Sequence, residues 1–434
     1  MENIKAYLGG RIFNSAELSQ AEIEFLISIG GKRKPAIIDR KCQRCLMTID
    51  IKNSKSKMVY CRSCINLGRI TQGDELIISP SEVVLPCLTD SIKWNGTLTA
   101  MQQKAAEELI TAFDTHTDHL VWAVTGAGKT EMIFPMINKA VAQGKRIAIC
   151  SPRIDVCIEL YPRIQAAFPE VSIGLFHGRS ETPYSLTQIV LATVHQLVKF
   201  EQAFDILVVD EVDSYPLAGS KMLNMAIQKS VKPIGNTLYL SATPPKELLK
   251  KVESKSITIS KLYQRFHTHP LPEPVCHMLF RPSNYKKINI RLKWKIKQMI
   301  KNGERFMLFF PKIPQMLEFA DNLRLLFPNL TFVDVSSKDD ARLDKVAQFR
   351  NGEVQAILTT TILERGVTFK HITVIVIDAD ANEFSKTALI QIAGRAGRDK
   401  KYFDDEVHFY YQSYNRQIKH ACSEIHYLNR QAKI

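Results

Sequence analysis

Several features that would place the chain in or across a membrane are missing from its sequence. None of its 434 residues falls in an apolar run of about 18 or more, which excludes an ordinary transmembrane helix. The opening MENIKAYLGGRIF lacks the apolar core and cleavage site of a secretory signal, and no lipidation motif is present. We therefore expect a cytoplasmic protein whose nine cysteines serve as metal ligands or buried thiols instead of disulfides.

Acidic residues are scarce relative to basic ones. The chain has 58 Lys and Arg against 44 Asp and Glu, a formal net charge of +14. Between Gly31 and Arg69, eleven Lys or Arg stand against only Asp39 and Asp50, a local net charge of +9. A charge run of this kind is often only a solvated face, but the overall balance favours a polyanionic partner, and nucleic acid above a membrane surface.

Tandem repeats and low-complexity tracts are also absent, and the length favours two or three ordinary domains. From about residue 98 onward, short β-branched runs alternate with longer helical ones, a pattern typical of parallel strands covered by helices. The Pro-rich stretch HTHPLPEPV, His267–Val275, interrupts this alternation, which then restarts. We predict an α/β fold with two lobes in series, each built on a parallel sheet.

The same patterns predict individual elements. Helices are expected at 16–30 and at 129–144, the second closed by Gly144. A further helix is expected to start near Thr99. Strands are expected at 119–124, 146–152, 171–178, 188–194, 205–211 and 237–243 in the first lobe, and at 305–311, 331–337, 355–361 and 372–379 in the second.

The stretch GAGKT, Gly126–Thr130, lies between a predicted strand and a predicted helix, as a Walker A phosphate loop requires. Its glycines allow backbone N–H groups to face a β-phosphate, and the helix N-terminus adds positive charge. Lys129 would neutralise the β- and γ-phosphates, and the Thr130 hydroxyl would help to hold Mg²⁺. The full pattern has Gly where Ala123 stands, and the alternative is a Gly-rich turn without a ligand.

The stretch DILVVDEVD places two acids directly after a predicted buried strand. Ligands bind at the carboxyl edge of an open parallel sheet, so Asp210 and Glu211 should face the phosphate loop. Asp210 is then placed to bind Mg²⁺ through water, and Glu211 to polarise the water that attacks the γ-phosphate. Ordinary turn residues are the alternative explanation.

The stretch QIAGRAGR, Gln391–Arg398, belongs to the second lobe. Arg395 and Arg398 are three residues apart and would share one face if the segment were helical. A guanidinium that reaches a γ-phosphate stabilises the charge that develops during phosphoryl transfer. The alternative is a surface helix with salt-bridging arginines.

Two cysteine pairs, CQRC and CRSC, are separated by fifteen residues, which is the spacing of a structural zinc site. Four thiolates from Cys42, Cys45, Cys61 and Cys64 would close a tetrahedral shell and leave no open position, so we expect a structural centre. An iron–sulfur cluster could use the same ligands, but the ribbon spacing favours Zn²⁺. The other cysteines are interpreted as ordinary thiols: Cys87, Cys150, Cys157, Cys276 and Cys422.

In their order and spacing these motifs resemble those of superfamily 2 helicases, from Leu98 to about His408. The minor motifs agree: SPR at 151–153, ATVHQL at 192–197 and TTTILERGVTF at 359–369. The resemblance implies two tandem RecA-like lobes that close on ATP, hydrolyse it between them and move a nucleic-acid strand. The family often has Asp where Thr368 stands, which removes support for a specific contact at that position.

The resemblance also implies roles for further residues. Ser241, Ala242 and Thr243 would couple the ATP site to the nucleic-acid face. The predicted nucleic-acid contacts are Arg153, Thr193, Thr360 and Arg365. The predicted ATP and Mg²⁺ ligands are Gln102, Gln103, Gly126, Ala127, Gly128, Lys129, Thr130, Asp210 and Gln391, and the predicted catalytic residues are Lys129, Asp210, Glu211, Arg395 and Arg398.

A four-Cys module ahead of the motor narrows the resemblance to the late competence ATPases of Gram-positive transformation. Replication-restart helicases share motor motifs, but their zinc cysteines lie between those motifs. The resemblance implies an ATPase stimulated by single-stranded DNA that helps to drive DNA uptake, at the inner face of the cell membrane. Its expected partners are a ComFC-like protein, single-strand handling proteins and, indirectly, the membrane channel; a homo-oligomer is left open.

Two other functions stay open, an RNA or repair helicase of the same superfamily and a nucleotide-gated binding module without turnover. Intact Lys129, Asp210, Glu211 and Arg398 argue against the second. The predicted segments are an N-terminal element (1–40), a zinc module (41–70), a connector (71–97), lobe 1 (98–265), a linker (266–276) and lobe 2 (277–434).

Overall fold

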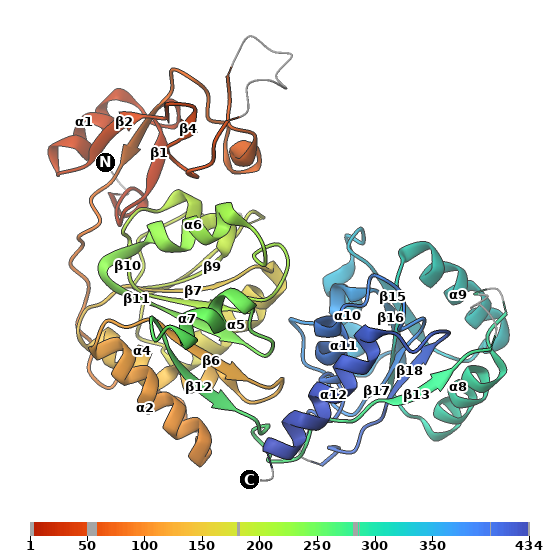
Figure 1. Ribbon diagram of the computed structural model, residues 1–434. Coiled ribbons are helices and arrows are strands. Elements are labelled where there is room, and N and C mark those ends of the chain that lie inside the picture. Colours follow the sequence, from red (N-terminus) through yellow and green to blue (C-terminus); the bar gives the residue numbers. More distant parts are fainter. Residues whose placement is uncertain are drawn as a thin grey trace. The chain divides into compact units, whose positions relative to one another are not determined.

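A computed structural model shows two compact units (Figure 1). Unit 1 comprises Met1–Ala123 and Lys129–Leu262, and unit 2 comprises Val124–Gly128 and Tyr263–Ile434. Within the described part of the chain, no helix is long and apolar enough to cross a membrane. The structure describes residues 4–49, 59–179, 183–280, 285, 287–399 and 401–432; the part of the predicted zinc module at 50–58 therefore lies outside the described residues.

The N-terminal part of unit 1 is a small module with an antiparallel sheet of order β1-β5-β2. Ser19 caps the predicted first helix through a capping box with Glu22, which satisfies backbone N–H groups that the helix leaves unpaired. Strand β5 comes from the predicted connector, so the connector and the predicted N-terminal element share one sheet. The module's elements are β1 (Ile12–Asn14), α1 (Gln20–Ser28), β2 (Lys32–Pro35), β3 (Ile37–Ile38), β4 (Lys41–Cys42), η3 (Arg62–Leu67) and β5 (Glu75–Ile78).

The rest of unit 1 is lobe 1, a seven-stranded sheet of order β12-β6-β11-β10-β7-β9-β8 in which every neighbouring pair is parallel. All six strands predicted for this lobe are confirmed. Strand β12, which was not predicted, adds to the edge beside β6. The strands are β6 (His119–Ala123), β7 (Ile147–Ser151), β8 (Ile173–Phe176), β9 (Ile189–Thr193), β10 (Phe204–Asp210), β11 (Val231–Ser241) and β12 (Thr258–Leu262).

One predicted helix of lobe 1 was wrong in extent. The segment 129–144 forms two helices, α3 (Lys129–Met132) and α4 (Phe134–Ala142), with a break at Ile133. Pro135 causes the break, because proline lacks an N–H and fits only in the first turn of a helix. The other helices of the lobe are α2 (Ala100–Asp114), α5 (Ile154–Ala167), η4 (Val194–Lys199), α6 (Lys221–Ser230) and α7 (Lys246–Glu253).

Unit 2 contains lobe 2, a six-stranded sheet of order β13-β18-β17-β14-β16-β15 that is parallel throughout. The four predicted strands are confirmed, and β13 and β18 were missed. The elements are β13 (Val275–Met278), α8 (Ile290–Asn302), β14 (Phe306–Phe309), α9 (Ile313–Leu326), β15 (Phe332–Val335), α10 (Arg342–Asn351), β16 (Ala356–Thr359), η5 (Thr361–Leu363), β17 (Thr373–Val376), α11 (Lys386–Ala393), β18 (Val407–Tyr411) and α12 (Arg416–Gln431).

The two sheets share one connectivity. If β6 to β11 and β13 to β18 are each numbered one to six along the chain, both sheets have the spatial order 1-6-5-2-4-3. The central strands of both are buried on both faces, as expected for parallel sheets covered by helices. The fold is thus two tandem RecA-like lobes preceded by a small four-Cys module, as the sequence predicts.

Polar anchors attach the N-terminal module to lobe 1 within unit 1. The fully buried Arg146 donates from Nη1 to the Gly9 carbonyl at 2.7 Å. The Arg11 guanidinium lies 4.3 Å from the centre of the Tyr184 ring, within cation–π range. The Lys229 ammonium, on α6, donates to the Arg44 carbonyl. The buried apolar residues of the module and the lobe accordingly form one continuous core.

Candidate ATPase site and metal centre

The phosphate loop follows β6, whose last residue is Ala123. Gly126 and Gly128 have φ angles of 80° and 72°, a backbone region that favours glycine because a side chain would be strained there. Lys129 is the first residue of α3 and donates from Nζ to the Ala123 carbonyl at 3.4 Å. Thr130 follows it in the same helix, so its hydroxyl is at the helix N-terminus. The local geometry is that of a loop which cradles phosphate.

Between the two glycines, Ala127 is 1% exposed and donates its N–H to the Val124 carbonyl at 3.2 Å. A small side chain suits such a buried position. The replacement of Gly by Ala at position 123 is also accommodated, because Ala123 is a fully buried residue of the regular strand β6.

Sheet order brings the acids to the same edge as the phosphate loop. Asp210 is the last residue of β10, and β11 separates β10 from β6. The Asp210 carboxylate accepts the N–H of Glu211 at 2.9 Å. Glu211 has a φ angle of +54°, in the left-handed region that non-glycine residues enter infrequently. The strand therefore ends in a sharp turn, and strained turns of this kind are concentrated at functional sites.

Asp213, which the sequence analysis missed, joins this acidic turn to the coupling motif. Its two carboxylate oxygens accept the hydroxyls of Ser241 and Thr243, each at 2.6 Å. Ser241 ends β11 and its Oγ also accepts the N–H of Thr243 at 3.0 Å. The intervening Ala242 is 5% exposed. The sequence could have pointed to Asp213, because it is the last residue of DEVD and shares that turn with the two predicted acids.

The predicted glutamines occupy different environments. Gln102 is 5% exposed and forms a capping box with Thr99, whose N–H its Oε1 accepts at 2.8 Å. Gln103 is exposed and donates to Glu107 at 3.0 Å. Gln391, on α11 in unit 2, is 6% exposed. Of the first two, Gln103 is the one that a nucleotide could reach without disturbing a helix cap.

In unit 2 the arginine-bearing end of the motif, 394–398, is a turn instead of a helix. Helix α11 ends at Ala393, so the two arginines do not share a helical face. The Arg395 side chain is 1% exposed and donates to the carbonyls of Glu364, at 3.0 Å, and Val367. These contacts tie the arginine motif to the TTTILERGVTF segment. The geometry favours a positioning role for Arg395.

Arg398 has a more open environment. Its Nε donates to the Gly394 carbonyl at 2.9 Å, and its Nη1 to the Thr368 hydroxyl at 3.3 Å. Thr368, the residue that departs from the family pattern, therefore supports this arginine. Because its guanidinium is partly exposed, Arg398 is the better candidate for an arginine finger.

Arg265, which precedes the Pro-rich linker, was also missed. Its side chain is 2% exposed and donates to the carbonyls of Ala396, at 2.9 Å, Gly397, and Gly394, at 3.3 Å. Nε2 of His267 lies 3.1 Å from the Gly397 carbonyl. Burial lowers the pKa of Arg265 to about 9, with a further contribution from Arg398. No local motif marks Arg265, because its partners lie about 130 residues away in the chain.

The predicted nucleic-acid contacts differ in accessibility. Arg153, the N-cap of α5, is half-buried and lies 3.9 Å from the Asp155 carboxylate. Thr360 is half-buried as well, at the N-cap of η5. Thr193 and Arg365 are only 4% and 3% exposed. Arg153 and Thr360 are thus the two that could meet a phosphate without rearrangement.

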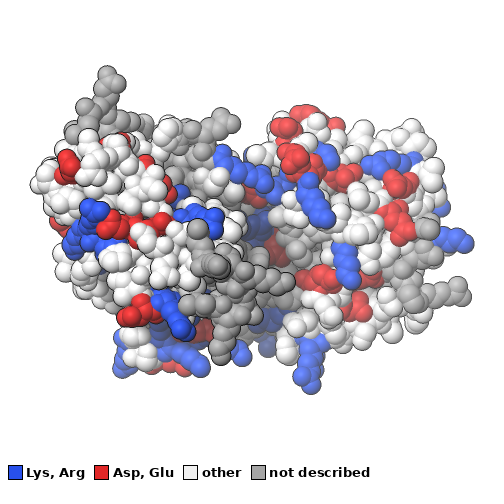
Figure 2. Space-filling view, turned by 90° about the horizontal axis from the view of Figure 1, so that it is seen from above, with Lys and Arg blue, Asp and Glu red and all other residues white. Residues whose placement is uncertain are grey.

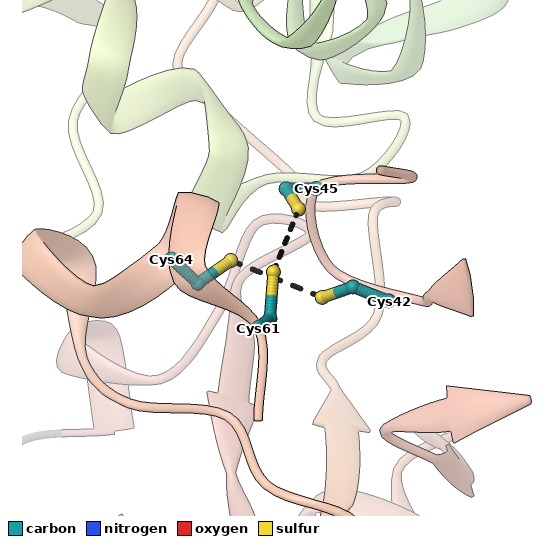
Figure 3. Close-up of side chains that lie close together, drawn as sticks. All are labelled: Cys42, Cys45, Cys61 and Cys64. Atoms are coloured by element: carbon teal, nitrogen blue, oxygen red, sulfur yellow. Dashed lines mark hydrogen bonds between the residues drawn. The ribbon is translucent and has the colours of Figure 1, made fainter. Parts of the chain in front are cut away.

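The four predicted metal ligands point toward one another (Figure 3). The sulfurs of Cys42 and Cys64 are 3.8 Å apart, and those of Cys45 and Cys61 are 3.4 Å apart. All four ligand atoms lie within 4.8 Å of one another, and each residue is at most 3% exposed. A tetrahedral ion with bonds of about 2.3 Å would place its sulfurs about 3.8 Å apart, so the cluster fits a structural metal site.

The remaining cysteines contribute no further cluster of three or more metal-ligating side chains among the described residues. Cys150 and Cys157 are buried, and burial raises the pKa of Cys157 to about 12, which keeps that thiol protonated. The sulfurs of Cys276 and Cys422 lie 3.9 Å apart in unit 2.

Family models match both lobes. The helicase conserved C-terminal domain matches residues 290–400, and the type III restriction enzyme res subunit matches residues 95–246. The chain also resembles the yeast (S. cerevisiae) helicase Dbp5 bound to RNA and ADP BeF3, with a TM-score of 0.55 and 14% identity over 76% of this chain and 91% of that one. The protein is therefore an ATPase of the superfamily 2 helicase class, which uses ATP and Mg²⁺.

Two curated relatives define the family more narrowly. The competence protein ComFA of Streptococcus pneumoniae is 39% identical over 431 residues, which cover 98% of each chain. ComFA of Bacillus subtilis is 36% identical over 90% of this chain and 86% of that protein. The chain belongs to the ComFA family.

Proposed function

We propose that this protein is an ATP-dependent translocase on single-stranded DNA that helps to drive the uptake of transforming DNA. The main support is its near full-length likeness to two competence proteins, together with an intact set of Walker residues at one sheet edge. A nucleotide-gated module without turnover would not need Glu211 on a strained turn beside Asp210.

Each residue has a defined task in the proposed reaction. The loop and Lys129 bind the β- and γ-phosphates of ATP, while Glu211 orients a water molecule and accepts its proton. The water oxygen forms a bond to the γ-phosphorus, the bond from that phosphorus to the β–γ bridging oxygen breaks, and ADP and phosphate result. Arg398 stabilises the charge on the transferred group. Thr130 and Asp210 would hold Mg²⁺, which neutralises charge on the phosphates when bound.

Asp213 offers a physical route from this reaction to movement. Because it binds both Ser241 and Thr243, a shift of the acidic turn on hydrolysis changes the end of β11 directly. A nucleic acid held at that edge through Arg153 would respond to such a shift.

The first test is steady-state ATP hydrolysis by the purified protein, alone and with single-stranded DNA, duplex DNA or single-stranded RNA, beside a Lys129→Ala control. We expect strong stimulation by single-stranded DNA and its loss in the control. Preference for RNA would move the protein to RNA remodelling. Hydrolysis that is indifferent to every polymer would reject the motor.

We also propose that the cysteine cluster binds Zn²⁺ and holds the module together, since four buried thiolates leave no position for catalysis. Metal analysis of the full chain should find one zinc per protein. Cys61→Ser should lose it, whereas Cys87→Ser, at an exposed cysteine outside the cluster, should keep it. Iron in place of zinc would reject this assignment.

The proposed partners are a ComFC-like protein, single-strand handling proteins and further copies of this chain. The module's exposed basic residues, such as Lys32 and Lys41, fit a polyanion as well as an acidic protein surface. Co-purification with the Cys61→Ser variant as comparison would show whether the module carries these contacts.

A further inference from the structure

The shared connectivity of the two lobes makes one junction directly comparable. In a parallel sheet, the helix after the first strand begins at the carboxyl edge, where ligands bind. In lobe 1 that junction is the phosphate loop. In lobe 2 it leads from β13 to α8, and α8 has the sequence IRLKWKIKQMIKN, with five basic residues and no acid. Figure 2 shows basic and acidic residues interspersed over the viewed face.

Helix α8 has two distinct faces. Leu292, Ile296 and Met299 are at most 3% exposed and pack into the core of lobe 2. The opposite face carries an aromatic ring, Trp294, which is 67% exposed. This indole therefore offers a flat aromatic face that a ligand can contact.

The cations on this outer face are available for a ligand. Arg291, Lys297 and Lys301 are exposed and have a helical spacing that places them along the same side as Trp294. Among the described residues, no acidic group lies within ion-pair distance of any of the three, whereas Lys295 is paired with Glu406. From Arg291 to Lys301 the helix rises about 15 Å, enough for several nucleotides.

We propose that the outer face of α8, defined by Arg291, Trp294, Lys297 and Lys301, is a binding site for single-stranded nucleic acid outside the motor motifs. The three cations contact phosphates and the indole stacks on a base, which is how proteins bind single strands without reading sequence. The inference extends the proposed function and rests on it only for the class of ligand.

The test is direct binding of fluorescent (dT)20 and (rU)20 to the full-length protein across a salt series. The triple variant Arg291→Gln/Lys297→Gln/Lys301→Gln should reduce the slope of log affinity against log salt by about 2, because each phosphate that a cation neutralises adds about 0.7 to that slope. Trp294→Ala should weaken binding about tenfold, and Trp294→Phe should restore most of it, because stacking needs only a ring.

A matched control keeps the charge change but moves its location. Arg350, Arg416 and Lys419 are exposed cations on other helices of unit 2, and their triple change to Gln should leave the salt slope near that of the parent. Equal loss in both triple variants, or none in either, would overturn the site. Unchanged (dT)20 affinity with lost binding to poly-glutamate would overturn it in favour of an acidic protein partner.

The binding assay also separates this inference from the proposed function. If no polymer stimulated ATP hydrolysis in the parent, the motor would be rejected, yet the α8 variants would still show whether this face binds single strands. Basal hydrolysis should be unchanged in both triple variants, since neither alters a residue of the ATP site.

Discussion

Lobe 1 and lobe 2 have the same strand order, yet their functional turns are held together in different ways. In lobe 1, side chains bind side chains: Asp213 accepts Ser241 and Thr243 at the sheet edge. In lobe 2, arginines bind backbone carbonyls: Arg395 and Arg265 between them hold five carbonyl groups. In lobe 1, a small displacement of the Asp213 carboxylate can be transmitted to the end of β11. In lobe 2, the bonds to carbonyl groups fix the path of a loop.

In both lobes, strand connectivity determines where the junction after the first strand lies, and residue chemistry determines what surface it presents. Equal connectivity places the junction after the first strand at the same sheet edge in both lobes. Glycines and Lys129 give that junction the geometry of a phosphate loop in lobe 1, whereas the cations and Trp294 of α8 give the lobe 2 junction a different surface.

The largest effects are expected from variants that distinguish a catalytic role of Arg398 from a structural role of Arg395. Arg398→Ala should lower kcat for ATP about 10³-fold, because the transition-state charge loses its finger. Arg395→Ala should instead lower the free energy of unfolding by about 2 kcal/mol, since two buried carbonyls lose their donor. Steady-state kinetics and urea unfolding of both variants would measure this. A stable Arg395→Ala enzyme with the larger loss of kcat would reverse the assignment.

Arg265 should act through the loop that it holds. Arg265→Met removes the donor to three carbonyls and should lower the free energy of unfolding by about 3 kcal/mol. Misplacement of the arginine turn should reduce kcat about 10²-fold with less effect on KM. Arg265→Lys should recover part of both losses. Loss of stability with unchanged kcat would limit Arg265 to a structural role.

His119 gives lobe 1 a predictable sensitivity to acid. Its ring binds the hydroxyls of Thr258, at 2.6 Å, and Ser260, at 2.8 Å, and burial lowers its pKa from 6.5 to about 4. The unfolded chain therefore binds a proton that the folded chain does not, so this stabilisation is complete above pH 6.5 and is lost as the pH falls toward 4.

A pKa difference of this size corresponds to about 3 kcal/mol at most. Unfolding of the parent and of His119→Gln, followed from pH 7 to pH 4, should show a shallower pH dependence in the variant. Parallel curves for the two proteins would mean that His119 does not contribute to the acid sensitivity.

The smallest effect is expected at Asp213. Asp213→Ala removes both acceptor oxygens and so loses two hydrogen bonds, which costs about 2 kcal/mol. The ratio of DNA-stimulated to basal hydrolysis should fall, because Ser241 and Thr243 no longer bind the turn together. Ser214→Ala, in the same turn but outside this network, is the control. An unchanged ratio would remove Asp213 from the coupling path.

Much of the fold could be predicted because its signals are local. Buried β-branched runs mark ten of the strands, and the phosphate loop and the cysteine pairs need only a few residues each. Where prediction failed, a nearby residue or a distant partner was decisive. Pro135 broke the helix after the loop, and β13 and β18 became recognisable as strands only through their parallel pairing in the lobe 2 sheet.

The sequence by itself therefore determined the phosphate loop, the acids after β10 and the cysteine cluster, because turn chemistry and ligand spacing are encoded over short distances. Only the tertiary structure decided that β5 joins the N-terminal sheet, that Arg395 is buried while Arg398 is more open, and that Arg265 holds the arginine turn. Those outcomes depend on which backbone groups need a partner once the chain is packed, and the arginines that satisfy that need stand from 28 to 132 positions away in the chain.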